Sequence, residues 1–263
     1  MVELHTLEVG ACTHPGCLAV KGASWAPARF PARAYLLKSK NEFSLWDTGY
    51  SQHFMSTNRL AARAYKWVTP VQYDHPSASL VTQLSTRGIE PADIKAIHIS
   101  HFHADHFAGL KDFPDAALWA SPKALASIQG LGGLNALLKA HLPELLPDDF
   151  YRRVRTYSDE QWVSLPPELT PFSHGWSLCD EETLYAVPLP GHAAGHVGVF
   201  VKTEKGWTLL AFDACWSHAG YENLVGPSEL SFLIQDDRAA YYDTLQKLHS
   251  LHLRGVPILL THA

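Results

Sequence analysis

The chain of 263 residues has no long apolar run, no cluster of basic residues and only four cysteines. No apolar stretch approaches the ~18 residues that cross a bilayer, so we expect no membrane span. Residues 1–8 carry acids and no basic stretch, which argues against a secretory signal and favours a cytoplasmic protein. In that compartment the cysteines are expected as reduced thiols. A formal net charge of −5 without a basic run argues against a nucleic-acid partner.

Histidine is abundant, with 16 residues, and three of them fall in the run Ser-His-Phe-His-Ala-Asp-His at 100–106. The apolar residues 94–99 before this run predict a buried strand. Side chains two apart on extended backbone face the same way, so the first two histidines can hold one metal ion. A turn after them would direct the aspartate and the third histidine toward a second position. The candidate ligands in this run are His101, His103, Asp105 and His106.

Three more candidate ligands stand at the ends of later apolar runs. One follows residues 184–189 in the loop Gly-His-Ala-Ala-Gly-His, one ends the run 209–212, and one ends the run 256–260. Four buried strands that each deliver a metal-binding side chain at the carboxyl end are hard to explain by packing alone. Imidazole and carboxylate suit zinc first, with manganese, iron and cobalt as alternatives. These later ligands are His192, Asp213 and His262.

The order of these seven residues resembles the signature of the metallo-β-lactamase-fold hydrolases, H-x-H-x-D-H followed by a single His, an Asp and a final His. The resemblance covers nearly the whole chain and implies one domain over residues 1–263, an α/β fold built as a four-layer αββα sandwich. It also implies two divalent metal ions. Metal one would be held by His101, His103 and His192, and metal two by Asp105, His106 and His262, with Asp213 bridging the two.

The resemblance extends to residues that would support the ligands. The segment Leu-Trp-Asp-Thr-Gly at 45–49 is similar to the family's early Asp-Thr-Gly, in which Asp47 would orient the metal loop. The alternative for Asp47 is an Asx-type turn that closes a hairpin. His196 would support the loop that carries His192. The implied mechanism is attack by a hydroxide shared between two metal ions, with Asp105 as catalytic proton shuttle.

The loop at 191–196 and the full ligand set resemble the acyl-homoserine lactone lactonases of this superfamily. Those enzymes place a tyrosine three residues after the bridging aspartate, where this chain has Trp216. His218 and Tyr221 are nearby candidates for the substrate pocket. We therefore expect hydrolysis of a lactone or carboxylic ester, with phosphodiesters and thioesters as alternatives. A metal-bearing sensor or binding protein is the alternative of another class.

Segments 50–76 and 121–150 are long for simple connections and rich in apolar residues, so each is expected to cover a pocket for an apolar substrate portion or to form a homodimer interface. The remaining chain alternates strands and helices. We predict a hairpin at 33–38 and 42–47, a helix at 77–88 capped by Ser77 or Ser79, strands at 94–100, 116–120, 161–164, 170–178, 183–189, 197–203 and 207–212, a helical region at 121–150 and a helix at 236–252.

Overall fold

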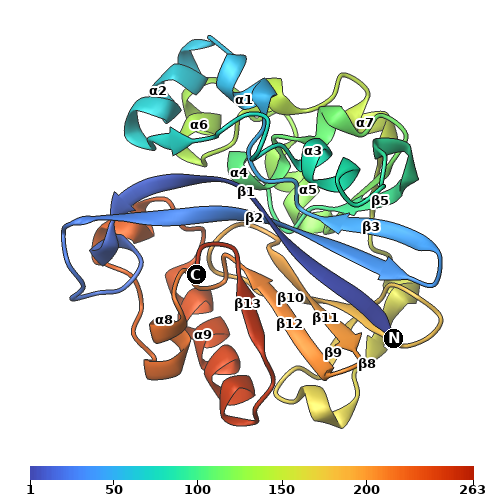
Figure 1. Cartoon of the computed structure of the whole chain (residues 1–263). Coiled ribbons are helices and arrows are strands. Elements are labelled where there is room, and N and C mark those ends of the chain that lie inside the picture. The colour runs from blue at the N-terminus through green and yellow to red at the C-terminus, as the bar shows by residue number, and fades with distance from the viewer.

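Two β-sheets pack face to face, with helices on their outer faces, in the computed structural model, which describes residues 1–263 (Figure 1). This arrangement confirms the expected αββα sandwich. One sheet contains, in spatial order, β4 (Val71–Gln72), β1 (Val2–Pro15), β2 (Pro27–Ser39), β3 (Glu42–Trp46), β5 (Ile94–His98), β6 (Ala117–Ala120) and β7 (Val154–Thr156). The other contains β13 (Ile258–Leu260), β12 (Gly206–Phe212), β11 (Val197–Thr203), β10 (Leu184–Pro188), β9 (His174–Ser177) and β8 (Trp162–Ser164).

The seven-stranded sheet starts from a long antiparallel pair, β1 and β2, which runs from Val2 opposite Ser39 to Pro15 opposite Pro27. The predicted hairpin at 33–47 is confirmed as the next antiparallel pair, β2 and β3. Strands β5, β6 and β7 then add in parallel, so that their carboxyl ends lie at the same edge. Strand β1 is absent from the predicted elements, and two of its residues line the cavity described below.

The helices of the structure include those predicted at 77–88, 121–150 and 236–252, with different bounds, and others that the sequence did not predict. The helices are α1 (Gln52–Ser56), α2 (Leu60–Val68), α3 (Leu80–Ser85), α4 (Ala104–Phe107), α5 (Pro122–Ile128), α6 (Gly133–Leu138), α7 (Phe150–Arg153), α8 (His218–Asn223) and α9 (Arg238–Leu253). Ser79 caps α3, accepting a hydrogen bond from the Thr82 amide. The helical region 121–150 is divided because Gly130 and Gly133 take positive φ angles of 68° and 58°. Each helix falls short of the length and apolar content that a membrane-spanning helix needs.

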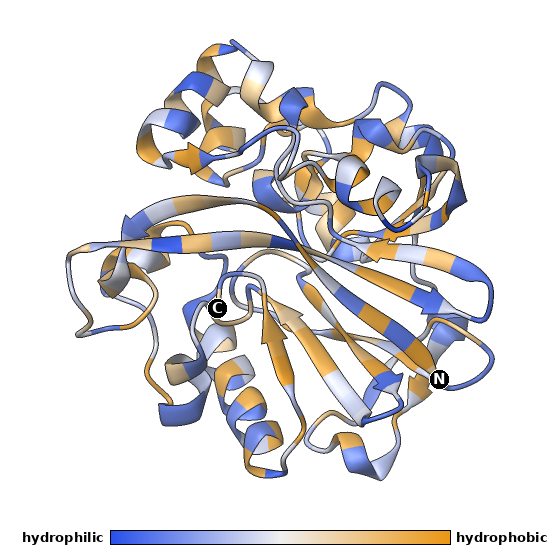
Figure 2. Cartoon of the chain, in the orientation of Figure 1, coloured by the Kyte–Doolittle hydropathy of each residue, from blue (hydrophilic) through white to orange (hydrophobic).

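The core between the sheets is built from strand residues of both sheets, among them Tyr35, Trp46 and Phe212. The ring of Phe212 lies 5.6 Å from that of Tyr35 and 5.5 Å from that of Trp46. A second and larger core lies between the seven-stranded sheet and helices α1–α7. Figure 2 shows the hydrophobic colour concentrated along the strands of the six-stranded sheet. The two sheets are thus held in a fixed relation, and the loops at one edge of both meet.

Candidate metal centre

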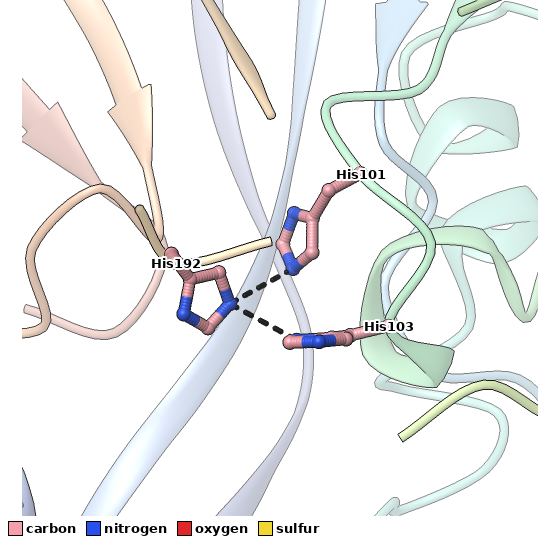
Figure 3. Close-up of side chains that lie close together, drawn as sticks. All are labelled: His101, His103 and His192. Carbon is pink, nitrogen blue, oxygen red and sulfur yellow. Dashed lines mark hydrogen bonds between the residues drawn. The ribbon is translucent and has the colours of Figure 1, made fainter. Parts of the chain in front are cut away.

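Three histidines from two loops converge at this edge (Figure 3). His101 and His103 follow β5, and His192 follows β10. The Nε2 atom of His192 lies 3.1 Å from His101 Nε2 and 3.0 Å from His103 Nδ1. Each neutral imidazole offers one donor and one acceptor nitrogen, so three nitrogens that converge on one point bring acceptor lone pairs close together. A metal cation placed among these nitrogens would use those lone pairs as ligands.

The protonation states of this triad suit a metal. Burial lowers the pKa of His101 and of His192 well below the ordinary value, and lowers that of His103 to about 4. Neighbouring imidazoles add to the effect at His101 and His192, because two positive charges this close repel. All three rings are therefore neutral near pH 7, which is the ligating form.

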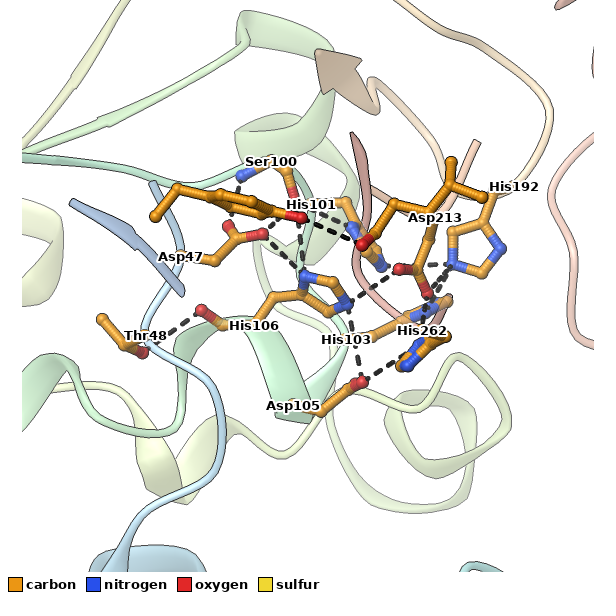
Figure 4. A network of polar contacts seen from close by, with 12 residues as sticks. Asp47, Thr48, Ser100, His101, His103, Asp105, His106, His192, Asp213 and His262 are labelled. Atoms are coloured by element: carbon orange, nitrogen blue, oxygen red, sulfur yellow. Dashed lines mark hydrogen bonds and ion pairs between the residues drawn. The ribbon is translucent and has the colours of Figure 1, made fainter. Parts of the chain in front are cut away.

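A second group of donors, with two carboxylates and two imidazoles, lies beside the first (Figure 4). His106 Nε2 is 3.5 Å from Asp105 Oδ2 and 3.4 Å from Asp213 Oδ1. His262 Nε2 is 3.0 Å from Asp213 Oδ2 and 3.5 Å from Asp105 Oδ2. Asp213 Oδ2 is also 3.5 Å from Nε2 of His192, so this carboxylate stands between the two groups. That is the place expected of a bridging ligand.

Charge in the second group is balanced internally. Burial lowers the pKa of His106, but Asp105, Asp213 and Asp47 outweigh it and hold the pKa well above its ordinary value. At His262 burial is likewise outweighed by the carboxylates, so its pKa is raised. Burial raises the pKa of Asp213, yet His262 and His106 together hold it well below the usual range. The positive charges of the protonated imidazoles compensate the carboxylates, as a divalent cation at the same place would.

The residues fit two metal ions. Within each group the donor atoms lie within 4.8 Å of one another. His106 Nε2 and Asp213 Oδ1 are buried, face each other and have no hydrogen-bond partner. Buried polar atoms without partners are rare in folded proteins, and a shared cation would satisfy both. Four strand ends and seven side chains that the sequence predicts as ligands are thus brought together, three in one group and four in the other.

Asp47 holds His106 from behind. Its carboxylate is fully buried and accepts hydrogen bonds from the Ser100 amide at 2.8 Å, the Ser100 hydroxyl at 2.7 Å and His106 Nδ1 at 2.7 Å. Because Nδ1 carries the donated proton, Nε2 is left to face the metal group. This contact agrees with the orienting role expected of Asp47, whose backbone also takes a positive φ of 58° as the chain leaves β3.

The loop that carries His192 is fixed by close approach to its neighbours. His196 Nδ1 lies 3.0 Å from the Leu189 carbonyl oxygen, and its ring meets the His101 ring edge-on at 4.9 Å. Gly195 has φ +69°, and a Cβ there would lie 2.1 Å from the amide nitrogen of Ala124 in α5. Only glycine therefore lets the loop dock on this helix. His196 contacts the start of this loop and belongs to neither donor group, and its supporting role stays a prediction.

A cavity of about 510 Å³ opens onto both donor groups, and most of its lining is apolar. Both long segments contribute to it, through Tyr65 and Val68 of 50–76 and Leu137 and Leu138 of 121–150. No lysine or arginine lines it. The full lining is Cys12, His14, Leu18, Ala19, Phe30, Tyr50, Ala64, Tyr65, Val68, Thr69, His103, Asp105, Leu137, Leu138, Ala140, His192, Asp213, Trp216, Leu230, Ser231, Ile234 and His262.

The three candidate pocket residues have different positions. Trp216 lines the cavity, and its indole Nε1 donates to Asp213 Oδ2 at 3.0 Å. His218 and Tyr221 are not among the lining residues, because the chain turns after Trp216 into α8, which packs on α9. The Tyr221 ring is buried 5.5 Å from that of His252 in α9.

The β1–β2 pair supplies lining residues that the sequence did not predict, namely Cys12, His14 and Phe30. Cys12 is buried, and burial raises the pKa of its thiol to about 12. Cys215 is also buried, with its thiol pKa raised to about 11 by burial, which agrees with an apolar packing role. No local motif marks the β1 and β2 residues, because they reach the site only through the pairing of a strand that was not predicted.

Comparison with known proteins identifies the class. The family model of the metallo-beta-lactamase superfamily matches residues 28–206, and the chain belongs to this superfamily. A probable metallo-hydrolase of Mycobacterium bovis is 28% identical over 189 residues, which cover 68% of this chain and 56% of the relative, little more than half of its length. The N-acyl homoserine lactonase AiiB of Agrobacterium fabrum is 24% identical over 249 residues, covering 88% of this chain and 79% of that protein.

Solved structures support the same fold. An N-acyl homoserine lactone hydrolase with the product N-hexanoyl-L-homoserine at its catalytic metal centre superposes with a TM-score of 0.71 at 18% identity, covering 98% of this chain and 92% of that one. The dizinc quorum-quenching lactonase AidC superposes with a TM-score of 0.66 at 15% identity, covering 99% and 87%. The family and the donor groups agree with the expected class, a metal-dependent hydrolase.

Proposed function

We propose that this protein is a dinuclear metal-dependent hydrolase of lactones or carboxylic esters that carry an apolar portion. The observation that carries the proposal is the opening of two adjacent donor groups into one largely apolar cavity. Zinc suits the imidazole and carboxylate donors best, with manganese, iron and cobalt as alternatives. Two bound divalent ions would supply an activated water and polarise the substrate oxygen.

The chain's own residues have separate roles in this proposal. Asp105 lines the cavity and also belongs to the second donor group, so its carboxylate can hold a proton and pass it to the leaving oxygen. Trp216 holds Asp213 through its indole N–H and closes one wall of the cavity. The apolar side chains of α2 and α6 exclude water from the substrate's apolar portion.

The cavity favours a neutral substrate over a phosphodiester. Phosphate recognition generally uses arginine or lysine, and neither residue type lines the cavity. Relatives and structural neighbours named as N-acyl homoserine lactonases support a lactone with an acyl chain as the first substrate class to test. Trp216 replaces the tyrosine expected in such lactonases, so a substrate carbonyl receives no phenolic hydroxyl from this position.

The experiment measures acid release in weak buffer by zinc- or manganese-loaded protein given a long-chain acyl-homoserine lactone, with Asp105→Asn as the matched variant. We expect rapid acid release that is lost in the variant, whose metal content is measured in parallel. No release by protein that holds both ions would overturn the lactone assignment. A panel of carboxylic esters, thioesters and phosphodiesters then identifies the scissile bond, and inactivity on all of them would favour a sensor.

A further inference from the structure

The last ligand of the second donor group is held by the opposite sheet. His262 follows β13 in the six-stranded sheet, yet its Nδ1 lies 2.8 Å from the Pro31 carbonyl oxygen of β2 in the other sheet. Two residues earlier, the Leu260 carbonyl oxygen accepts a hydrogen bond of 2.9 Å from the buried Tyr35 hydroxyl, also on β2. The segment is therefore fixed on both sides of Thr261.

Arg33 makes the third contact between β2 and this segment. Its Nη1 donates to the carbonyl oxygens of Leu260 at 3.1 Å and Thr261 at 3.0 Å, and also to that of Ala263. These are all the hydrogen bonds of this half-buried guanidinium, and each goes to a main-chain oxygen of the segment that carries His262. A guanidinium with several donors in one plane suits a set of converging carbonyl oxygens.

The three β2 residues that contact this segment act together. They lie two positions apart along the strand, at Pro31, Arg33 and Tyr35, and therefore share one face of β2. We call these three residues the β2 clamp. Through the clamp, Nε2 of His262 is directed at Asp213, at 3.0 Å, and at Asp105, at 3.5 Å. The imidazole is held through its other nitrogen, the usual way in which a ligand's orientation is fixed.

We propose that Arg33 is a positioning residue for the second metal ion, because it immobilises the backbone that carries His262. The proposal rests on the dinuclear site of the proposed function, but not on the identity of the substrate. Arg33 itself touches none of the seven ligand side chains through a hydrogen bond. Its effect is conveyed by the carbonyl groups on both sides of His262.

The charge of Arg33, taken alone, predicts that its loss strengthens metal binding, which is opposite to the effect of a positioning role. A guanidinium near a cation site repels the incoming ion, so loss of its positive charge should strengthen metal binding by Coulomb's law. Loss of the clamp should instead weaken binding, because His262 would have to be ordered when the ion binds. The sign of the change therefore separates a positioning role from a purely electrostatic one.

The experiment titrates metal-free full-length protein with zinc against a chromophoric chelator and counts bound ions by elemental analysis. Arg33→Met removes the donors and the charge at similar length, and Arg33→Lys keeps the charge and some donors. The matched control is Arg29→Met, an exposed arginine of the same strand that pairs with Glu8. For Arg33→Met we expect an affinity for the second ion that is lower by about 10- to 100-fold, with the first ion unchanged.

Hydrogen exchange of the amides in 258–262 is the second readout. We expect faster exchange there in Arg33→Met, partial recovery in Arg33→Lys and no change in Arg29→Met. In a His262→Ala background, Arg33→Met should cause little further loss of the second ion, because the two residues act as one unit.

Three outcomes would overturn the proposal: unchanged or tighter binding of the second ion, equal loss of both ions with uniformly faster exchange, or full additivity with His262→Ala. If Arg33→Met does not fold, Arg33→Lys carries the same comparison. Since binding and exchange are measured rather than turnover, a negative substrate panel leaves this result interpretable.

Discussion

Replacing Asp47 by asparagine tests how the second donor group is oriented. The carboxylate of Asp47 accepts three hydrogen bonds, two from Ser100 and one from Nδ1 of His106 at 2.7 Å. The variant amide has the same shape and can still accept from the Ser100 amide with its oxygen. Its NH₂ group then takes the place of Oδ2, which faces the Ser100 hydroxyl and His106.

An NH₂ group at this position forces the His106 ring to accept at Nδ1. The proton of the neutral ring then moves to Nε2, the atom that faces Asp105 and Asp213 at 3.5 and 3.4 Å. A protonated nitrogen cannot bind a metal ion. Altered partners behind a ligand lower metal affinity by about 10- to 100-fold, which corresponds to about 1.4–2.7 kcal/mol at the second ion.

The assay is zinc titration of metal-free protein, with His106→Ala as the reference for complete loss of this ligand. Asp112→Asn is the matched control, because Asp112 makes a contact of the same length, 2.7 Å, with His53 outside both donor groups. We expect Asp47→Asn to resemble His106→Ala and Asp112→Asn to resemble the unmodified chain. Two ions bound by Asp47→Asn with unchanged affinities would refute the tautomer argument.

Three further predictions address pH, loop docking and Asp213. The pKa values of His106 and His262 are raised, so protons compete with the second ion as the pH falls, whereas burial keeps the triad histidines neutral to about pH 4. Elemental analysis after equilibration at decreasing pH should therefore show that the second ion leaves first. Simultaneous loss of both ions would contradict this order. Gly195→Ala should lower the free energy of unfolding by about 1–3 kcal/mol in urea titrations, since its Cβ would lie 2.1 Å from an α5 amide nitrogen, and an unchanged midpoint would contradict it. Trp216→Phe keeps the aromatic wall but removes the donor to Asp213, so metal affinity should fall by roughly 1.5–3 kcal/mol, while equal affinity would make the indole N–H dispensable.

The ligands could be predicted from the sequence because each one ends an apolar run. Local periodicity places such runs in buried strands, and the order of residues such as His192 and Asp213 matches the family signature. Asp47 was recognisable for the same reason, since Asp-Thr-Gly follows the strand β3. The sequence predicted these residues through short patterns, each contained within a few residues.

Strand β1 had no such pattern. Val2 and Leu4 pack in the core between the sheets, whereas Leu7 and Val9 pack in the core under the helices, so no single alternation runs along the strand. The role proposed for Arg33 was equally hidden, because its partners lie more than 200 residues away. The pocket assignment of Tyr221 followed sequence proximity to Asp213, but the turn before α8 directs the chain into a third core, which lies between the six-stranded sheet and α9.

The two donor groups also differ in when their ligands are synthesised. All three triad residues have been synthesised once His192 has been made, whereas His262 follows about 70 residues later. At about 5–20 residues per second, this interval lasts several seconds. The loop that carries His192 is held by the Asp236 amide on the Gly191 carbonyl oxygen and by the Thr244 hydroxyl on the Pro190 carbonyl oxygen. A nascent chain therefore cannot order the triad until α9 has been made, and we expect both donor groups to become able to bind metal ions only at the end of synthesis.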